Sequence, residues 1–175
     1  MPISFGTPFD NGASGTGTSL SVTGVVLSTG ARVFVRTTRA SISGVETLTI
    51  GSDVVPLFGT SLNDGTDTVN HYEYVVTVSG TYTITQSLTV TATFRGIQGV
   101  IYSGLEGVSV FAGKIQSNPG TVADATTSGL LIPNAESGIL IGWSYDFNAA
   151  GSNAGTGFTS RATFPTEAAA NGSAS

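Results

Sequence analysis

Residues 81–94 alternate between apolar and hydroxyl side chains, broken only at Gln86, and this alternation constrains the fold more than any other feature of the sequence. The apolar members of one parity are Tyr82, Ile84, Leu88, Val90, Ala92 and Phe94. Threonine or serine fills most of the other parity. A period of two is that of a β-strand with one buried face, whereas an amphipathic helix repeats every 3.6 residues. Threonine suits the exposed face because its branched β-carbon fits a pleated strand. The segment therefore predicts one bent strand, or two strands interrupted near Gln86-Ser87.

Similar alternation recurs along the chain, bounded by Gly, Ser, Asn and Pro at short spacings. The further candidate strands are residues 20–27, 31–38, 45–50, 54–58, 72–78, 99–102, 108–111, 129–132, 139–147 and 158–164. No segment has a helical period. So many short strands predict an all-β fold, a single antiparallel β-sandwich or jelly-roll-like domain. The Ser79-Gly80 pair predicts a hairpin that joins residues 72–78 to residues 82–90.

Charge is scarce in this chain. Only 10% of its 175 residues are charged, and the net charge is −5. Glycine, serine and threonine make up 71 residues. Coiled coils and helical bundles require a composition rich in charged residues, alanine and leucine. A nucleic-acid-binding protein needs a basic patch, which six cations do not readily supply. The composition therefore favours a neutral, hydroxyl-rich surface and predicts no nucleic-acid partner.

The chain has no cysteine, which excludes disulfides, thiol catalysis and cysteine-based zinc sites. No apolar run approaches the roughly 18 residues of a membrane span, so no membrane partner is predicted. The N-terminus has neither a basic region nor a continuous apolar segment of the kind found in secretion signals. We expect synthesis in a cytoplasm without export through a signal peptide.

Both ends of the chain differ in composition from its middle. Residues 1–18 are rich in Gly, Ser, Thr and Pro, with Phe5 and Phe9 as isolated apolar side chains. Residues 166–175 are mostly Ala, Gly and Ser. Such ends fray unless something holds them, and a neighbouring subunit is the simplest candidate. The sequence predicts an extended N-terminal arm over 1–18 anchored by Phe5 and Phe9, a β-sandwich domain over 19–165 and a C-terminal tail over 166–175.

Motifs for catalysis are missing from the sequence. The one histidine, His71, lies at the start of a strand pattern, and no Gly-x-Ser-x-Gly elbow occurs. No two acidic residues stand at positions i and i+2 on one strand face. Residues 63–67 combine Asn, Asp, Gly and Thr, which suits either a hard cation or a polar turn, and the turn is the preferred interpretation. We predict a protein that is not an enzyme, with no catalytic residues, no metal and no cofactor.

Three aromatic residues, Trp143, Tyr145 and Phe147, share one parity where an apolar strand runs into a polar loop. Aromatic side chains supply large buried area, so a core position is the first interpretation. A subunit interface and an exposed platform for a glycan are the two alternatives.

The chain resembles the accessory structural proteins of tailed bacteriophages, in particular capsid decoration or cement proteins and related β-sandwich head or tail components. The resemblance lies in the Met-Pro start, the Thr/Gly/Ser/Val-rich strands such as residues 81–94, and the Gly-rich ends. It implies a jelly-roll or related sandwich that is often oligomeric, with a trimer favoured, and with an arm that reaches neighbouring subunits. The implied partners are the major capsid protein or other virion subunits, and the implied location is the virion. A glycan- or receptor-binding sandwich and a surface appendage subunit are the alternatives.

Overall fold

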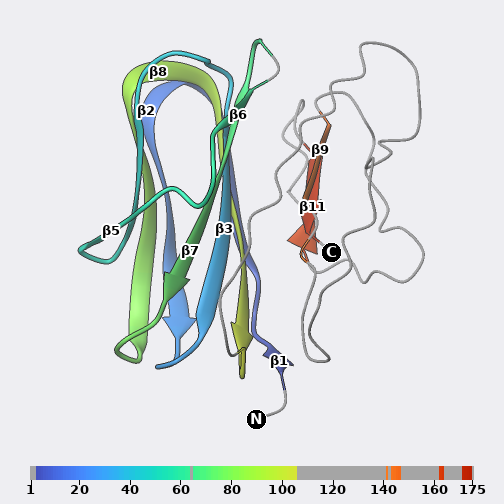
Figure 1. The fold of residues 1–175 in the computed structure, drawn as a ribbon. Helices are drawn as coiled ribbons and strands as arrows, with labels where there is room; N and C mark the ends of the chain where they lie inside the picture. Colours follow the sequence, from blue (N-terminus) through green and yellow to red (C-terminus); the bar gives the residue numbers. More distant parts are fainter. Residues whose placement is uncertain are drawn as a thin grey trace.

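The computed structural model describes residues 3–63, 65–105, 141, 143–146, 162–163 and 171–174 (Figure 1). Regular structure in this part of the chain is entirely β-strand, so the prediction of an all-β fold is confirmed. Over the described residues there is no helix with the length and apolar character needed to cross a membrane.

The strands follow one another closely along the first hundred residues. In chain order they are β1 (Ser4–Phe5), β2 (Phe9–Leu27), β3 (Arg32–Arg39), β4 (Glu46–Ile50), β5 (Asp53–Val55), β6 (Leu62–Asn63), β7 (Thr68–Val75), β8 (Gly80–Ser103), β9 (Trp143–Asp146), β10 (Ala162–Thr163) and β11 (Asn171–Ala174). The first eight strands form one antiparallel sheet.

Strand β8 is the centre of this sheet. One of its edges pairs first with β4, over residues 84–88, and then with β3, over residues 95–102. Its other edge pairs with β2 and β1. Figure 1 shows β2 and β8 arching over together, so that the sheet curls onto itself as a half-barrel. We call the part with β5, β4, the start of β8 and the end of β2 the β4 half, and the part with β6, β7, β3, the end of β8 and the start of β2 the β3 half.

The main hydrophobic core lies between the two halves. Leu48, Ile50 and Ile84 come from the β4 half, whereas Val33, Val35 and Ile97 come from the β3 half. Each of these side chains is at most 1% exposed. Burial of such side chains contributes roughly 1.5–3 kcal/mol each. The facing halves therefore form the sandwich-like arrangement that the alternation predicts.

The bend of β8 contains an irregularity that reverses which parity faces the core. Ile84 and Ile97 both lie in the core although one is even-numbered and the other odd-numbered. Two steps along β2, from Gly17 to Ser19, match five steps along β8, from Ala92 to Ser87. Unmatched residues of this kind form bulges, which bend a strand and shift its side chains to the other face. The sequence predicts the bent strand correctly, but the irregularity lies beyond Ser87 rather than at Gln86-Ser87.

The predicted hairpin between β7 and β8 is wrong. Strand β3 lies between them, and β7 belongs to the β3 half whereas β8 begins in the β4 half. A tight two-residue hairpin turn needs a positive φ, and Gly80 does not have one. Instead, Gly51 and Ser52 form a two-residue turn between β4 and β5, and Gly51 has a φ of 61°. Glycine adopts this backbone conformation without a steric penalty.

The two ends of the chain are paired where the sequence predicts an arm and a tail. Residues 4–5 and 9–18 belong to β1 and β2, which pair with β8 of the same chain. Residues 171–174 form β11, which lies between β9 and β10 in a small antiparallel sheet. The predicted strands at 108–111 and 129–132 lie outside the described residues.

A second, smaller cluster covers the outer face of the β3 half. Val100 and Tyr102 are buried there, and partly buried apolar side chains pack against them. These are Ile3, Phe5, Phe34, Leu105 and Ile141. Ile141, which follows β8 by many residues in the chain, thus packs against this face of the sheet.

Candidate functional site

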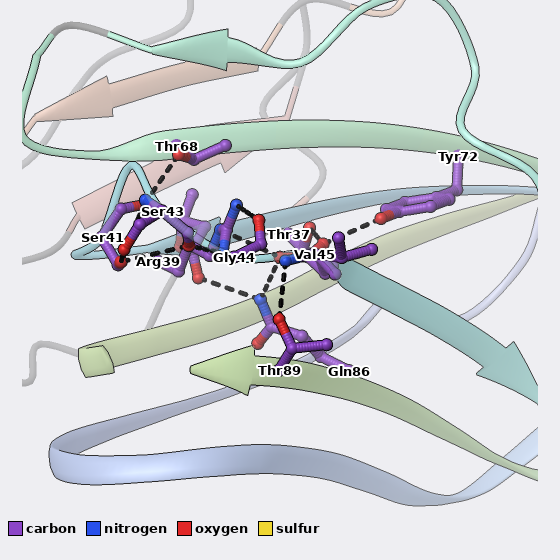
Figure 2. A network of polar contacts seen from close by, with 12 residues as sticks. Thr37, Arg39, Ser41, Ser43, Gly44, Val45, Thr68, Tyr72, Gln86 and Thr89 are labelled. Carbon is purple, nitrogen blue, oxygen red and sulfur yellow. Dashed lines mark hydrogen bonds and ion pairs between the residues drawn. The ribbon is translucent and has the colours of Figure 1, made fainter. Parts of the chain in front are cut away.

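The most extensive polar cluster among the described residues surrounds the Glu46 carboxylate, at the start of β4 (Figure 2). Tyr72 of β7 donates a hydrogen bond of 2.9 Å to Oε1, and Thr37 of β3 donates to the same oxygen. Gln86 of β8 donates from Nε2 to Oε2 at 2.9 Å. Arg39 forms an ion pair with Oε2 at 3.8 Å. The carboxylate therefore joins four strands across the two halves of the sandwich. We call these five residues the Glu46 cluster.

Arg39 extends the cluster to the loop that joins β3 to β4. Its Nη1 donates to the carbonyl of Ser43 at 2.7 Å, and its Nη2 donates to the carbonyl of Gly44 at 3.0 Å. The Thr68 hydroxyl donates to the carbonyl of Ser41 at 2.7 Å. Figure 2 shows these contacts from Arg39 and Thr68 to the loop. The loop is thereby fixed to Arg39 of the cluster and to Thr68 of β7.

The Glu46 cluster is closed to solvent. The side chain of Glu46 is 1% exposed and that of Arg39 is 5% exposed. Burial, with the neighbouring Glu46 carboxylate, holds the pKa of the Tyr72 hydroxyl well above its usual value. Tyr72 therefore stays protonated and acts as a hydrogen-bond donor. The fixed donors around this carboxylate, shut away from water, take up its hydrogen-bonding capacity within the fold.

Sequence analysis did not identify the Glu46 cluster, although the alternation contains a signal for it. Glu46 has the parity of the buried Leu48 and Ile50, and Arg39 has the parity of the buried Val33 and Val35. An acid and a base on the apolar parity of successive strands indicate a buried ion pair, since charged groups are buried only with partners.

A polar row crosses the outer face of the β3 half. Arg36 of β3 lies directly opposite His71 of β7 on one side and Gln98 of β8 on the other. Asp10 of β2 lies opposite Gln98. Arg36 is 1% exposed and Gln98 is fully buried. Burial, assisted by the positive charge of Arg36, lowers the pKa of His71 to about 4. A general base works best when its pKa is near the working pH, so His71 is a weak one at neutral pH.

For the polar loop at 63–67 the sequence allowed two interpretations, a site for a hard cation or a polar turn. Asp67 is buried, and the Thr66 hydroxyl donates to its carboxylate at 2.7 Å. The loop joins β6 to β7, which pair as a short hairpin. Within the described ranges, no group of three or more His, Cys, Asp or Glu side chains is placed to hold a metal ion.

The two phenylalanines predicted as arm anchors both lie against β8. Phe9 is 8% exposed and belongs to the main core. Its ring lies over Gly99, where an added β-carbon would be 1.9 Å from Cζ of the ring. Phe5 contacts Tyr102 edge to face, with ring centroids 5.3 Å apart. Both rings therefore hold the start of the chain to the end of β8.

Two of the three predicted platform residues lie on β9. Trp143 is opposite Ala174 and Tyr145 is opposite Gly172, both of β11. The shared parity of Trp143 and Tyr145 on one strand follows the sequence pattern. Phe147 lies outside the described residues. For all three aromatic residues, the alternative roles in a core, a subunit interface or a glycan platform stay predictions.

Comparison with known proteins adds no family to this picture. No protein-family model matches the chain, and no curated protein matches it either.

Proposed function

We propose that this chain is a non-enzymatic structural protein of a virion, a capsid decoration or cement protein that stabilises an assembled phage shell by bridging neighbouring subunits. Its partners are the major capsid protein or other virion subunits, and it acts as a homo-oligomer, with a trimer favoured. The observation that carries the proposal is the outer face of the β4 half.

This outer face carries rows of hydroxyl groups, bordered by the exposed side chains of Val54, opposite Thr49, and Val26, opposite Thr81. Thr49 of β4, Thr85 of β8 and Ser21 of β2 lie in one row, and the hydroxyls of Ser21 and Thr85 are 2.9 Å apart. The next row consists of Thr47, Ser87 and Ser19. In the described strands of the β4 half, the acids do not interrupt these rows. Glu46 is buried in the interior, and Asp53 accepts a hydrogen bond from the Tyr74 hydroxyl at 2.6 Å.

A neutral hydroxyl face suits permanent contact with a neighbouring protein. Burying a charged group costs several kcal/mol unless it finds a partner, whereas a threonine hydroxyl requires one hydrogen bond. Its methyl group adds apolar area to the contact. A protein that binds only the assembled shell stabilises that shell by mass action. The interior agrees with this function, because the Glu46 cluster serves the fold and is closed to ligands.

Binding to assembled shells tests the proposal directly. The wild-type protein is mixed with shells purified from the phage that encodes it, the shells are pelleted, and their thermal disruption is followed by light scattering. We expect co-sedimentation and a higher disruption temperature. Sedimentation velocity of the free protein reports its oligomeric state, for which we expect a trimer.

Two lysine variants locate the surface that binds. Thr83→Lys adds a charge to the exposed hydroxyl face, and we expect it to weaken shell binding at least tenfold. Thr60→Lys adds the same charge to an exposed loop residue outside that face, and we expect binding like that of the wild type. Shells that neither bind nor gain stability from the wild-type protein would refute the proposal.

A further inference from the structure

The start of the chain forms a distinct unit within the sheet. We call residues 4–14 the N-terminal segment. Its main chain pairs with β8 over residues 94–103, in the order Ser4 with Ser103 through Ser14 with Phe94. Between the two paired stretches, the amide of Gly6 donates to the carbonyl of Ile101 at 2.8 Å. The N-terminal segment thus occupies one edge of the second part of β8.

A short joint connects the N-terminal segment to the rest of β2. The pairing register with β8 shifts between Ser14 and Gly17 and again between Gly17 and Ser19. Gly15, Thr16 and Thr18 are exposed. Gly15 has a φ of 93°, and an added β-carbon there would have no neighbour within 4 Å. Residues 15–18 are therefore a joint with irregular pairing, in which Gly15 has open surroundings and Gly17 lies against the guanidinium of Arg95.

Arg95 holds both sides of this joint. Its Nη1 donates to the carbonyl of Gly15 at 3.0 Å, and its Nε donates to the carbonyl of Ser19 at 3.2 Å. Nη1 also donates to the carbonyl of Ala92 at 2.8 Å. The arginine is fixed to β8 and contacts β2 within the joint, at Gly15, and directly after it, at Ser19. The N-terminal segment itself is held to β8 by its own main-chain pairing.

The edge of β8 is shaped for this particular segment. Phe9 fills the space that the missing side chain of Gly99 leaves, and Phe5 packs against Tyr102. A strand without an aromatic side chain at the right register would leave that space empty. The chemistry of the acceptor edge therefore selects residues 4–14 of this chain, whether they come from the same copy or from another.

We propose that the N-terminal segment exchanges between two copies of the chain, so that residues 4–14 of each copy pair with residues 94–103 of the other. In the closed form the N-terminal segment pairs with β8 of its own chain, and in the exchanged form it pairs with β8 of the other chain. Both forms contain the same contacts, so the conformation of the joint and the protein concentration determine which form is populated. Neighbouring subunits held on one shell have a high effective concentration, which favours exchange. The inference rests on the proposed function in this respect, and it assigns the bridging contact to the predicted arm.

Engineered cysteines distinguish the two forms, because the natural chain has none. Ser4 and Ser103 lie opposite each other, at the separation of about 4.5–5.5 Å between α-carbons that antiparallel pairs show. This separation allows a disulfide. In Ser4→Cys/Ser103→Cys, closed chains form an intramolecular bond, and exchanged chains form a covalent dimer on a non-reducing gel. We expect the dimer fraction to increase with protein concentration during refolding.

The matched control places the cysteines beyond the joint. Ser19 and Ser87 are also opposite each other on β2 and β8, and both are exposed. We expect Ser19→Cys/Ser87→Cys to give intramolecular bonds alone at every concentration. We also expect a mixture of the single variants Ser4→Cys and Ser103→Cys, refolded together, to form a covalent heterodimer, whereas neither single variant forms one alone.

The inference is overturned if Ser4→Cys/Ser103→Cys forms only intramolecular bonds at every concentration and the mixed single variants stay monomeric. Far-ultraviolet circular dichroism of both double variants under reducing conditions shows that each is folded. The shell-binding experiment uses the wild-type protein without cross-links. A protein that binds shells without exchanging therefore refutes the exchange alone, and a protein that exchanges without binding shells refutes the proposed function alone.

Discussion

Glu46 shows how a charged side chain can be accommodated inside a small β-sandwich. Its two oxygens accept hydrogen bonds from Thr37, Tyr72 and Gln86, and Arg39 supplies the opposite charge. Burying the pair costs desolvation energy, so its net stabilisation is small. Its four partners come from three other strands, however, so one register satisfies all of them and a slipped register does not.

Replacement of Glu46 by alanine is therefore expected to be severe. The substitution leaves the Arg39 charge and three polar side chains without their shared partner in the interior, which costs about 3–5 kcal/mol of unfolding free energy. Glu46→Gln retains one acceptor oxygen, so we expect a smaller loss of unfolding free energy for this variant. Urea denaturation followed by tryptophan fluorescence measures both, with exposed Thr47→Ala as the control. Equal stability of Glu46→Ala and Thr47→Ala would contradict the structural role of the cluster.

His71 is expected to make the protein less stable in mild acid. Its pKa is lowered from 6.5 to about 4 in the folded chain. Between these values the unfolded chain binds a proton that the folded chain does not, so stability decreases as the pH drops through this window. The expected loss between pH 7 and pH 5 is about 2 kcal/mol. His71→Gln removes this contribution, so urea midpoints measured at pH 7 and pH 5 differ less for the variant than for the wild type.

At the scale of the elements, β8 determines the architecture. It is the partner of β1, β2, β3 and β4, and its bend converts one sheet into two facing halves. On the inner side of the sheet, the ring of Phe9 of β2 lies directly against β8. Gly99 supplies the space for this ring because it has no side chain. This pairing of a large and a small side chain fixes the register of the N-terminal segment.

A double-mutant cycle tests the contact between Phe9 and Gly99. Gly99→Ala introduces a methyl group into the ring of Phe9, and overpacking of this kind costs about 1–3 kcal/mol. Phe9→Ala alone costs about 3–5 kcal/mol through the cavity that it creates. Because Phe9→Ala removes the clash, Gly99→Ala is expected to add little cost in the double variant. Additive costs, measured by thermal unfolding, would show that the two side chains do not contact each other.

The alternation in the sequence predicts individual strands well but their pairing poorly. The apolar parity of residues 82–88 is the parity that faces the core, since Ile84 and Leu88 are buried as expected. Two strands that follow each other in the chain can pair as a hairpin or can be separated in the sheet by a third strand. The alternation of apolar and polar residues is identical in the two cases. The Ser79-Gly80 pair therefore suggested a hairpin that the structure does not contain.

The two ends and the Glu46 cluster illustrate a different limit of the sequence. Residues 9–18 are mostly small and polar, yet they form a strand because β8 offers an edge and Phe9 fits Gly99. Tertiary contacts of this kind override a weak local preference. Glu46 is a comparable case, because the partners that make its burial tolerable come from strands distant in the sequence.

The whole molecule is dominated by contacts between distant parts of the chain. Strand β2 pairs with β8 although five strands lie between them in the chain, and Arg95 bonds to carbonyls of residues near the start of the chain. Closing loops of this size costs entropy before the contacts form. Such a topology folds far more slowly than one built from local hairpins.

Refolding is accordingly expected to take about milliseconds to seconds. Stopped-flow fluorescence after dilution from urea measures the rate. Arg95→Met removes bonds at the bend where the two long strands turn together, and we expect faster unfolding than in the wild type. Exposed Thr60→Ser serves as the control with an unchanged rate. Refolding within microseconds would contradict the dominance of distant contacts.

The position of β8 in the chain also matters while the protein is being made. A ribosome releases the residues of β1 through β7 before it releases Gly80. Four of those strands, β1, β2, β3 and β4, pair with β8. The end of β2 gains its partner when residues 80–87 have left the ribosome, whereas β1 has none until Ser103 follows, although both strands have been free the longest. The nascent chain therefore exposes unpaired strands of low charge until β8 is complete, as a consequence of the order in which its strands are synthesised.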